Sequence, residues 1–186
     1  FLEAAVGEMT RLVELTDGRA FLLFTSLRNM ERAHEMLKDR IDYPLLLQGT
    51  SSRRDLLDRF RADEHSVLCA SASFWQGVDV RGPGLSLVVI DKLPFAVPDD
   101  PLTSARIERI RDEGGNPFMQ LQIPAAALTL KQGLGRLIRS AADRGIMAVL
   151  DSRLVRKFYG RIFIRSLHGS PVVNKFDVVK RWWVKE

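Results

Sequence analysis

The chain has 186 residues, 46% of them hydrophobic, with a formal net charge of +5 and a sequence pI of about 9.7. This composition predicts one compact domain over residues 1–186, and the positive charge favours an anionic partner such as nucleic acid or nucleotide phosphate. A single cysteine, Cys69, excludes a disulfide framework, a zinc quartet or an iron–sulfur cluster built by this chain alone. No signal peptide opens the sequence, and no apolar run approaches membrane-spanning length. Because the sequence begins at Phe1 rather than Met, we expect a piece of a longer protein.

Extended and helical patterns alternate along the chain. Short apolar runs bounded by glycine, proline or charged residues predict strands at 20–25, 45–48, 66–71, 85–90 and 145–151. Helical spacing of apolar residues predicts helices at 2–15, 27–40, 52–62, 102–112, 125–140, 155–167 and 177–183. Ser26 is expected to cap the second helix and Ser52 the third, while Asp17 and Gly18 end the first.

This alternation predicts the α/β fold class, with a mostly parallel sheet and helices on both faces. Parallel strands need crossover connections, and these are usually helical. Ligands of such sheets bind beyond the carboxyl ends of the strands. Four strand exits, FTS, CASASFW, DKLPF and DSR, are therefore expected at one edge of the sheet.

The exit segment CASASFWQGVDVRG carries the most varied chemistry. Ser71 and Ser73 can donate hydrogen bonds to phosphates, and Gly77 can let the backbone turn under a ligand. Asp79 can accept a hydrogen bond from a ribose hydroxyl or from an arginine. Phe74 and Trp75 either stack on a base or belong to the core, and core packing is the favoured interpretation when they are taken alone.

The segment LKQGLGRLIRS places Gln132, Arg136 and Arg139 on one stripe of a helix, because their spacing is 0, 4 and 7. Each interior glycine costs a helix about 1 kcal/mol relative to alanine. Gly133 and Gly135 therefore suggest that a large group, such as a phosphate, approaches the backbone closely.

Four segments, in this order, resemble motifs of superfamily two helicases. FLLFTSLRNM resembles motif IV, S-F-W-x-G-V-D resembles motif V, VVIDKLPFAVPDDP resembles the segment that follows it, and Q-x-x-G-R-x-x-R resembles motif VI. The resemblance runs from Ala20 to Tyr159 and is to the XPD/DinG family of DNA helicases, within it to the bacterial DinG and YoaA group. One such segment would be weak evidence, but four in order are a specific match.

The resemblance implies the second RecA-like motor domain of an ATP-driven, 5′-to-3′ DNA helicase. No G-x-x-x-x-G-K-[ST] segment occurs in the chain, so ATP and Mg²⁺ are expected to be held mainly by the first motor domain of the same protein. In the family that domain also carries an iron–sulfur cluster. We expect this chain alone not to hydrolyse ATP.

By the same resemblance, Arg136 and Arg139 meet the γ-phosphate across the interdomain cleft, where a guanidinium can neutralise two oxygens at once. Gln132 orients a phosphate oxygen or the attacking water. The expected nucleotide-binding positions are Gly77, Asp79 and Gly133. A solvated helix face is the plainer alternative for this stripe. The glutamate that relatives often carry before the motif V glycine is Gln76 here, which weakens any carboxylate role at that position.

The expected contacts to single-stranded DNA lie at strand exits, where hydroxyls and backbone amides can hold a phosphodiester without reading bases. They are Thr25, Ser26, Ser71, Ser73 and the turn from Lys92 to Phe95. Helix capping is the alternative for Thr25 and Ser26, and both roles can coexist.

Other features have plainer interpretations. His34, His65 and His168 share no metal-ligand spacing, so no metal site is predicted. Asp91 resembles the end of a Walker B strand but is interpreted as a loop residue. A basic run either follows a nucleic-acid backbone or, more commonly, forms a solvated face. It consists of Arg153, Arg156, Lys157, Arg161 and Arg165.

The terminal segment FDVVKRWWVKE places Phe176, Val179 and Trp183 on one apolar stripe. The stripe either docks on the chain's own sheet or binds a partner. The resemblance suggests an accessory subunit of the replicative clamp loader as that partner.

Two other functions stay open. One is a non-catalytic nucleic-acid- or protein-binding module that keeps the motor fold, and the other is a motor that moves on RNA. A Walker A motif elsewhere in the full-length gene would decide most of the first question. We expect a bacterial cytoplasmic protein that joins the nucleoid during DNA repair and has no membrane partner.

Overall fold

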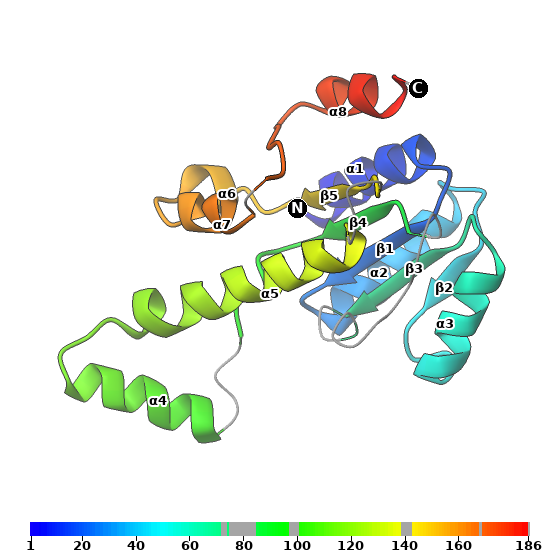
Figure 1. The fold of residues 1–186 in the computed structure, drawn as a ribbon. Helices are drawn as coiled ribbons and strands as arrows, with labels where there is room; N and C mark the ends of the chain where they lie inside the picture. The colour runs from blue at the N-terminus through cyan, green and yellow to red at the C-terminus, as the bar shows by residue number, and fades with distance from the viewer. Residues whose placement is uncertain (72–73, 75–84, 97–100, 139–142, 168, 186) are drawn as a thin grey trace.

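The computed structural model describes the chain except for residues 72–73, 75–84, 97–100, 139–142, 168 and 186 (Figure 1). Within the described ranges, the centre is a parallel sheet in the order β2-β3-β1-β4-β5. Its strands are β1 (Ala20–Phe24), β2 (Leu45–Leu47), β3 (Val67–Ser71), β4 (Leu87–Ile90) and β5 (Ile146–Val149). The central strands are almost wholly buried, because helices cover both faces. The predicted α/β class is confirmed.

Two hydrophobic clusters lie on the two faces of the sheet. One contains side chains of α1 (Leu2–Leu15) and α2 (Leu27–Lys38), and α8 (Phe176–Trp183) packs on it from outside (Figure 1). The other contains side chains of α3 (Arg53–Ala62), α5 (Ile123–Leu137) and α7 (Gly160–Ser166). No helix among the described residues has both the length and the apolar character needed to cross a membrane.

The predicted helix ends follow from local chemistry. The Ser26 hydroxyl oxygen accepts a hydrogen bond from the Asn29 amide at 3.4 Å, and Ser52 does the same for Asp55 at 3.1 Å. After α1 the backbone turns at Gly18, where φ is +74°. A Cβ at Gly18 would lie 2.0 Å from a neighbouring carbonyl oxygen, so only glycine fits. Both caps and the end of the first helix are confirmed.

A helical hairpin stands out from the sheet. It consists of α4 (Pro101–Asp112), the π-helix η2 (Phe118–Gln122) and the first turns of α5, and it extends beyond the carboxyl ends of the strands (Figure 1). Asn116 starts η2 by accepting hydrogen bonds from two successive backbone amides through its Oδ1. The sequence pattern predicts that the second helix of this hairpin starts at 125, which is after the π-helix. The pattern misses the π-helix because it contains no signal for one.

The single helix predicted at 155–167 is wrong, because the chain forms a corner there. α6 (Arg153–Arg156) ends at Lys157, whose backbone is extended (φ −100°, ψ 145°), and α7 then starts at Gly160. A Cβ at Gly160 would lie 1.9 Å from the Leu154 carbonyl oxygen. The corner therefore depends on backbone packing that only glycine permits.

Candidate functional site

The exits of all five described strands lie at one edge of the sheet. The register pairs Phe24 with Ser71 and Leu23 with Ile90, so the exits of β3, β1 and β4 are neighbours. The first polar side chains at these exits are Gln48, Ser71, Thr25, Asp91 and Asp151. The predicted convergence of strand exits is confirmed.

At the exit of β1, the buried carboxylate of Asp91 fixes the backbone. Its Oδ1 accepts a hydrogen bond from the Thr25 amide at 2.9 Å, whereas its Oδ2 has no partner among the described residues. Burial raises the pKa of Asp91. Thr25 itself is exposed, and Ser26 is half-buried and caps α2. The capping interpretation is thus confirmed for Ser26.

At the exit of β3, Ser71 is held by Gln48. The amide and the hydroxyl of Ser71 both donate to Oε1 of Gln48, at 2.7 and 2.9 Å. The hydroxyl proton is therefore already used inside the chain. A phosphate oxygen could receive this proton only if the hydroxyl turned away from Gln48.

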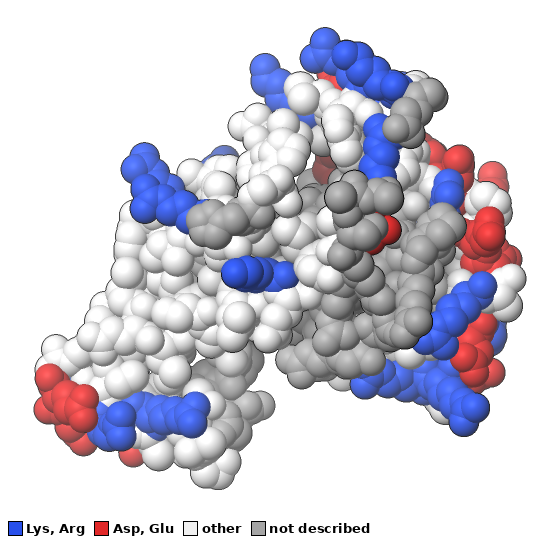
Figure 2. All heavy atoms as spheres, in the orientation of Figure 1, with Lys and Arg blue, Asp and Glu red and all other residues white. Residues whose placement is uncertain are grey.

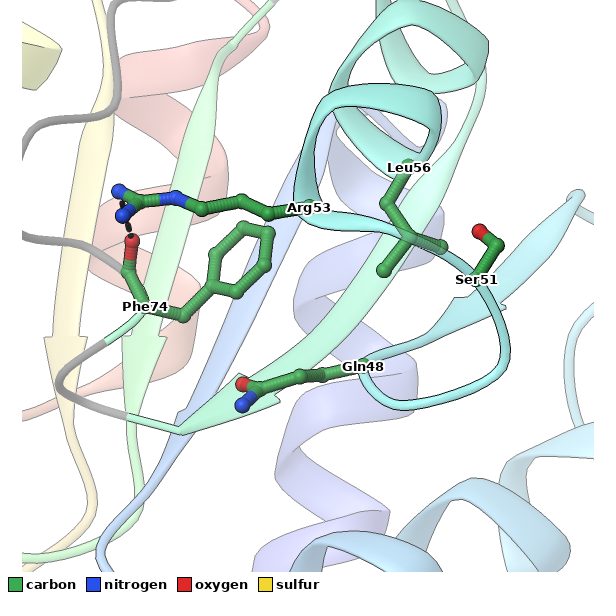
Figure 3. Close-up of a pocket in the computed structure, with 5 residues that line it drawn as sticks. All are labelled: Gln48, Ser51, Arg53, Leu56 and Phe74. Atoms are coloured by element: carbon green, nitrogen blue, oxygen red, sulfur yellow. Dashed lines mark hydrogen bonds between the residues drawn. The ribbon is translucent and has the colours of Figure 1, made fainter.

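A pocket of about 330 Å³ lies beside this exit, between β2, the start of α3 and Phe74 (Figure 3). Its other lining residues are Gln48, Ser51, Arg53 and Leu56. Arg53 donates from Nη2 to the Phe74 carbonyl at 2.9 Å, and its guanidinium lies 5.1 Å from the centre of the Phe74 ring. The Phe74 side chain is buried in the core, which confirms the packing interpretation for this residue.

Asp151 joins the exits of β4 and β5. It accepts hydrogen bonds from the Leu93 amide at 3.0 Å and from the amide and guanidinium of Arg153 at 2.6–3.0 Å. Burial alone would raise the pKa of Asp151, but the hydrogen bonds from Arg153 and Leu93 outweigh it and lower the pKa. The carboxylate thus connects the Lys92–Phe95 turn to α6.

Phe95 belongs to an aromatic cluster beneath this edge. Its ring centre lies 5.4 Å from that of Phe118, 5.9 Å from Tyr159 and 5.8 Å from Phe163. The Arg153 guanidinium lies 5.4 Å from the same ring. These contacts cover most of the Phe95 ring. Lys92, which is half-buried, comes earlier in the same turn. A DNA contact through Phe95 stays a prediction.

The last turns of α5 lie at the opposite edge. Leu137 packs against Gly145, just before β5 begins alongside Leu87 at the start of β4. Gln132 is exposed, Gly133 is buried and Gly135 is exposed. Apart from the chain neighbours of Gly135 and the backbone of its own helix, no described atom lies within 4 Å of the position that a Cβ on Gly135 would take. The room beside this glycine is not filled by the described part of the chain.

Several predicted site residues lie outside the described residues: Ser73, Gly77, Asp79 and Arg139. The same holds for Trp75 and Gln76, and for the side chain of Arg136, whose backbone belongs to α5. Of the predicted site residues that the structure describes, Thr25, Ser71 and Lys92 lie at the carboxyl edge of the sheet. Gln132 lies toward the opposite edge.

Whether this chain could hold a metal ion or an iron–sulfur cluster depends on which side chains can act as ligands. The described residues contain no group of three His, Cys, Asp or Glu side chains that could hold an ion. Cys69 is fully buried within β3, and burial raises the pKa of its thiol well above the usual range. A buried, protonated thiol does not fit as a ligand of an iron–sulfur cluster.

Three residues that shape the carboxyl edge belong to no motif in the sequence. Gln48 directly follows β2, so its position beside Ser71 can be read from the strand order. Asp151 lies in the predicted exit DSR, but its contact with Leu93 depends on the path of another loop. The contact between Arg53 and Phe74 has no sequence signal at all.

Known proteins share this fold and these segments. A model of the helicase C-terminal domain matches residues 9–170. The ATP-dependent DNA helicase YoaA of Haemophilus influenzae is 51% identical over 94% of this chain and 28% of its own length. The ATP-dependent helicase DinG of Mycobacterium tuberculosis is 46% identical over 86% of this chain and 24% of its own length.

This chain thus spans about a quarter of the length of these curated relatives. An apo XPD structure superposes with a TM-score of 0.67 at 22% identity, covering 90% of this chain and 35% of that one. This likeness supports the RecA-like fold. The chain belongs to the helicase C-terminal domain family, with relatives of the DinG and YoaA type.

Proposed function

We propose that this chain is the second motor domain of an ATP-dependent DNA helicase that moves 5′ to 3′ along a single strand in the bacterial cytoplasm. The observation that carries the proposal is the carboxyl edge of the sheet. There, exposed or half-exposed polar groups stand on backbone that buried carboxylates hold in place. Rigid hydroxyls and amides at strand ends suit a phosphodiester backbone.

The proposed DNA contacts are Thr25, Ser26, Ser71, Ser73, Lys92 and Phe95. Thr25 is the best placed of the described residues, because its side chain is exposed while its amide is held by Asp91. Lys92 offers a cation at the next exit. Ser71 can contribute only lone pairs while its proton is donated to Gln48.

The proposed nucleotide contacts are Gln132, Gly133, Arg136, Arg139, Gly77 and Asp79. The exposed amide of Gln132 and the empty space beside Gly135 support an approach of phosphate groups to this end of α5 from outside the domain. Arg136 and Arg139 would stabilise the charge that develops on the transferred phosphoryl group. ATP, when bound, supplies the phosphoanhydride bond whose cleavage drives movement.

The groups that hold triphosphate and Mg²⁺, together with an iron–sulfur cluster, are proposed to lie in the first motor domain of the full-length protein. We also propose that α8 is the region that meets an accessory subunit of the replicative clamp loader. The stripe of Phe176, Val179 and Trp183 packs on the cluster under α1, so only the outer side of α8 is available. Trp182, 43% exposed, lies on that outer side.

The test uses the full-length protein and two partial duplexes, one with a 5′ single-stranded tail and one with a 3′ tail. We expect DNA-stimulated ATP hydrolysis and unwinding of the 5′-tailed substrate. The isolated 186-residue chain is expected to show no hydrolysis under the same conditions. Unwinding of the 3′-tailed substrate alone would overturn the polarity. Absence of ATP hydrolysis by the full-length protein, with or without DNA, would overturn the motor itself and leave the non-catalytic binding module.

A further inference from the structure

The positive charge of the chain is concentrated in one segment. Residues 152–176 contain six Lys or Arg and no Asp or Glu, whereas the whole chain has 28 and 23 of these. Four of the six cations are exposed on or beside α6 and α7: Arg156, Lys157, Arg161 and Arg165. Within the described ranges, none of these four forms an ion pair. A surface of this kind is complementary to a polyanion.

The corner between α6 and α7 also presents an aromatic ring to solvent. Phe158 is 70% exposed, and the neighbouring Tyr159 is 6% exposed within the aromatic cluster of Phe95, Phe118 and Phe163. The Phe158 ring lies 5.4 Å from that of Tyr159 in an edge-on arrangement. Because Tyr159 is anchored and the corner requires glycine at 160, the exposed ring stands on a rigid base.

This corner continues the carboxyl edge of the sheet. The side chain of Asp151 binds the Leu93 amide on one side and Arg153, the first residue of α6, on the other. Figure 1 shows α6 and α7 beyond the end of β5, on the side toward which the strands point. In Figure 2 the surface over these helices shows Lys or Arg side chains and no Asp or Glu.

We propose that the α6–α7 corner binds single-stranded DNA, with one nucleobase stacked on Phe158 and the adjoining phosphates near Arg156, Lys157 and Arg161. The inference rests on the proposed function, to which it adds a second contact zone with a different chemistry. Strand exits hold phosphates, whereas this corner offers a π-face that accepts any base, flanked by cations. Translocation on DNA of any sequence requires such tolerance.

The experiment measures the affinity of the full-length protein for two fluorescein-labelled 20-mers by anisotropy without nucleotide. One is oligo-dT, and the other has abasic tetrahydrofuran units in place of every nucleoside. Phe158→Ala is expected to bind oligo-dT about tenfold more weakly and the abasic strand unchanged, since only stacking is lost. Phe158→Tyr should restore the oligo-dT affinity. The double variant Arg156→Gln, Arg161→Gln should weaken binding to both strands and reduce the salt dependence.

Val155→Ala is the matched control, because Val155 is 67% exposed on the same corner and apolar but has no π-face. It should bind both strands like wild type. Melting temperatures of all variants should stay near that of wild type, since the changed side chains are exposed. Unchanged oligo-dT affinity of Phe158→Ala, or equal losses on both strands, overturns the inference.

An equal effect of Val155→Ala also overturns it, because the loss of DNA affinity would then not depend on a π-face. In these cases the proposed function stands, provided that the wild-type protein binds DNA and hydrolyses ATP. Failure of the wild-type protein to bind either strand would remove the proposed function as well.

Discussion

The carboxyl edge of the sheet and the last turns of α5 differ in how completely this chain builds them. At the carboxyl edge, side chains of the chain itself fix the exits: Asp91 holds the Thr25 amide, Gln48 holds Ser71, and Asp151 holds the turn after β4. At the end of α5, Gln132 and Gly135 are exposed, and the described residues do not fill the space beside Gly135. Contacts within the chain fix the first region, whereas at the second the described residues leave these two positions open to solvent.

This difference separates the two proposed tasks. Changes at the end of α5 should affect turnover and leave the fold and DNA binding intact. Changes at the buried carboxylates should affect stability first, because they remove contacts within the chain.

The largest expected effect follows removal of Arg136 or Arg139. In the full-length protein, Arg136→Ala or Arg139→Ala should lower DNA-stimulated ATP turnover by about 10³-fold or more, since charge on the transferred phosphoryl group is no longer neutralised. Affinity for single-stranded DNA should change less than about twofold. Lys131→Ala is the control, because Lys131 is an exposed cation of the same helix outside the stripe. Wild-type turnover in both arginine variants would exclude their catalytic role.

The next largest effect is expected for Asp151→Asn. The Asn amide group would face the donors of Arg153 and Leu93, so unfolding free energy should fall by about 2 kcal/mol. Solvent screening limits the loss, because the Arg153 side chain is 41% exposed. Urea unfolding at pH 7 measures it.

The pH dependence of the same variant gives an independent check. The pKa of Asp151 is lowered in the folded state, so its contribution is full above the unfolded pKa and is lost as pH falls through the folded pKa. The stability difference between wild type and Asp151→Asn should therefore shrink in acid. A difference that grows as the pH falls below 4 would contradict the assignment.

The two terminal tryptophans form a matched pair for α8. Trp183 packs on the cluster under α1, and Trp182 is more exposed. Trp183→Ala should lower stability by about 1–2 kcal/mol, a few degrees in Tm, because a partly buried aromatic surface is lost. Trp182→Ala should have a smaller effect, because its more exposed ring contacts only the Arg144 guanidinium at 4.5 Å and the Trp183 ring at 5.9 Å among the described contacts. Differential scanning calorimetry compares them, and the reverse order would show that the outer face of α8 is the packed one.

The smallest effect is expected for Asp91→Asn. The Asn oxygen can still accept from Thr25, and the substitution removes a buried charge whose Oδ2 has no partner in the described part of the chain. Stability at pH 7 should change by less than about 1 kcal/mol. Because burial raises the pKa of Asp91, wild type should lose stability relative to Asp91→Asn as pH rises through the folded pKa. This slope is opposite in sign to that of Asp151.

Sequence patterns predict the sheet, its exits and the helix caps, because these depend on local periodicity and on side chains within three residues of the amides they cap. Ser26 and Ser52 are examples. The corner at Gly160 could not be predicted, since the helical spacing of 155–167 continues across it while the constraint comes from the Leu154 carbonyl. The hydrogen bond from the Ser71 hydroxyl to Gln48 could not be predicted for a similar reason, because it depends on the order of the strands in the sheet. The predicted start of the second helix of the hairpin differs from the structure, because a π-helix has no distinct apolar period that the sequence pattern could show.

The separation of charge along the chain bears on how the molecule would approach the proposed DNA strand. Outside residues 152–176, 22 Lys and Arg face 23 Asp and Glu, so the rest of the chain has a formal net charge of −1. The molecule is therefore an electric dipole rather than a uniformly basic body. In the field of a polyanion it experiences a torque that turns the α6–α7 side forward before contact. Association rates should consequently fall with rising ionic strength, because added salt screens this torque over a Debye length of about 10 Å at 0.1 M.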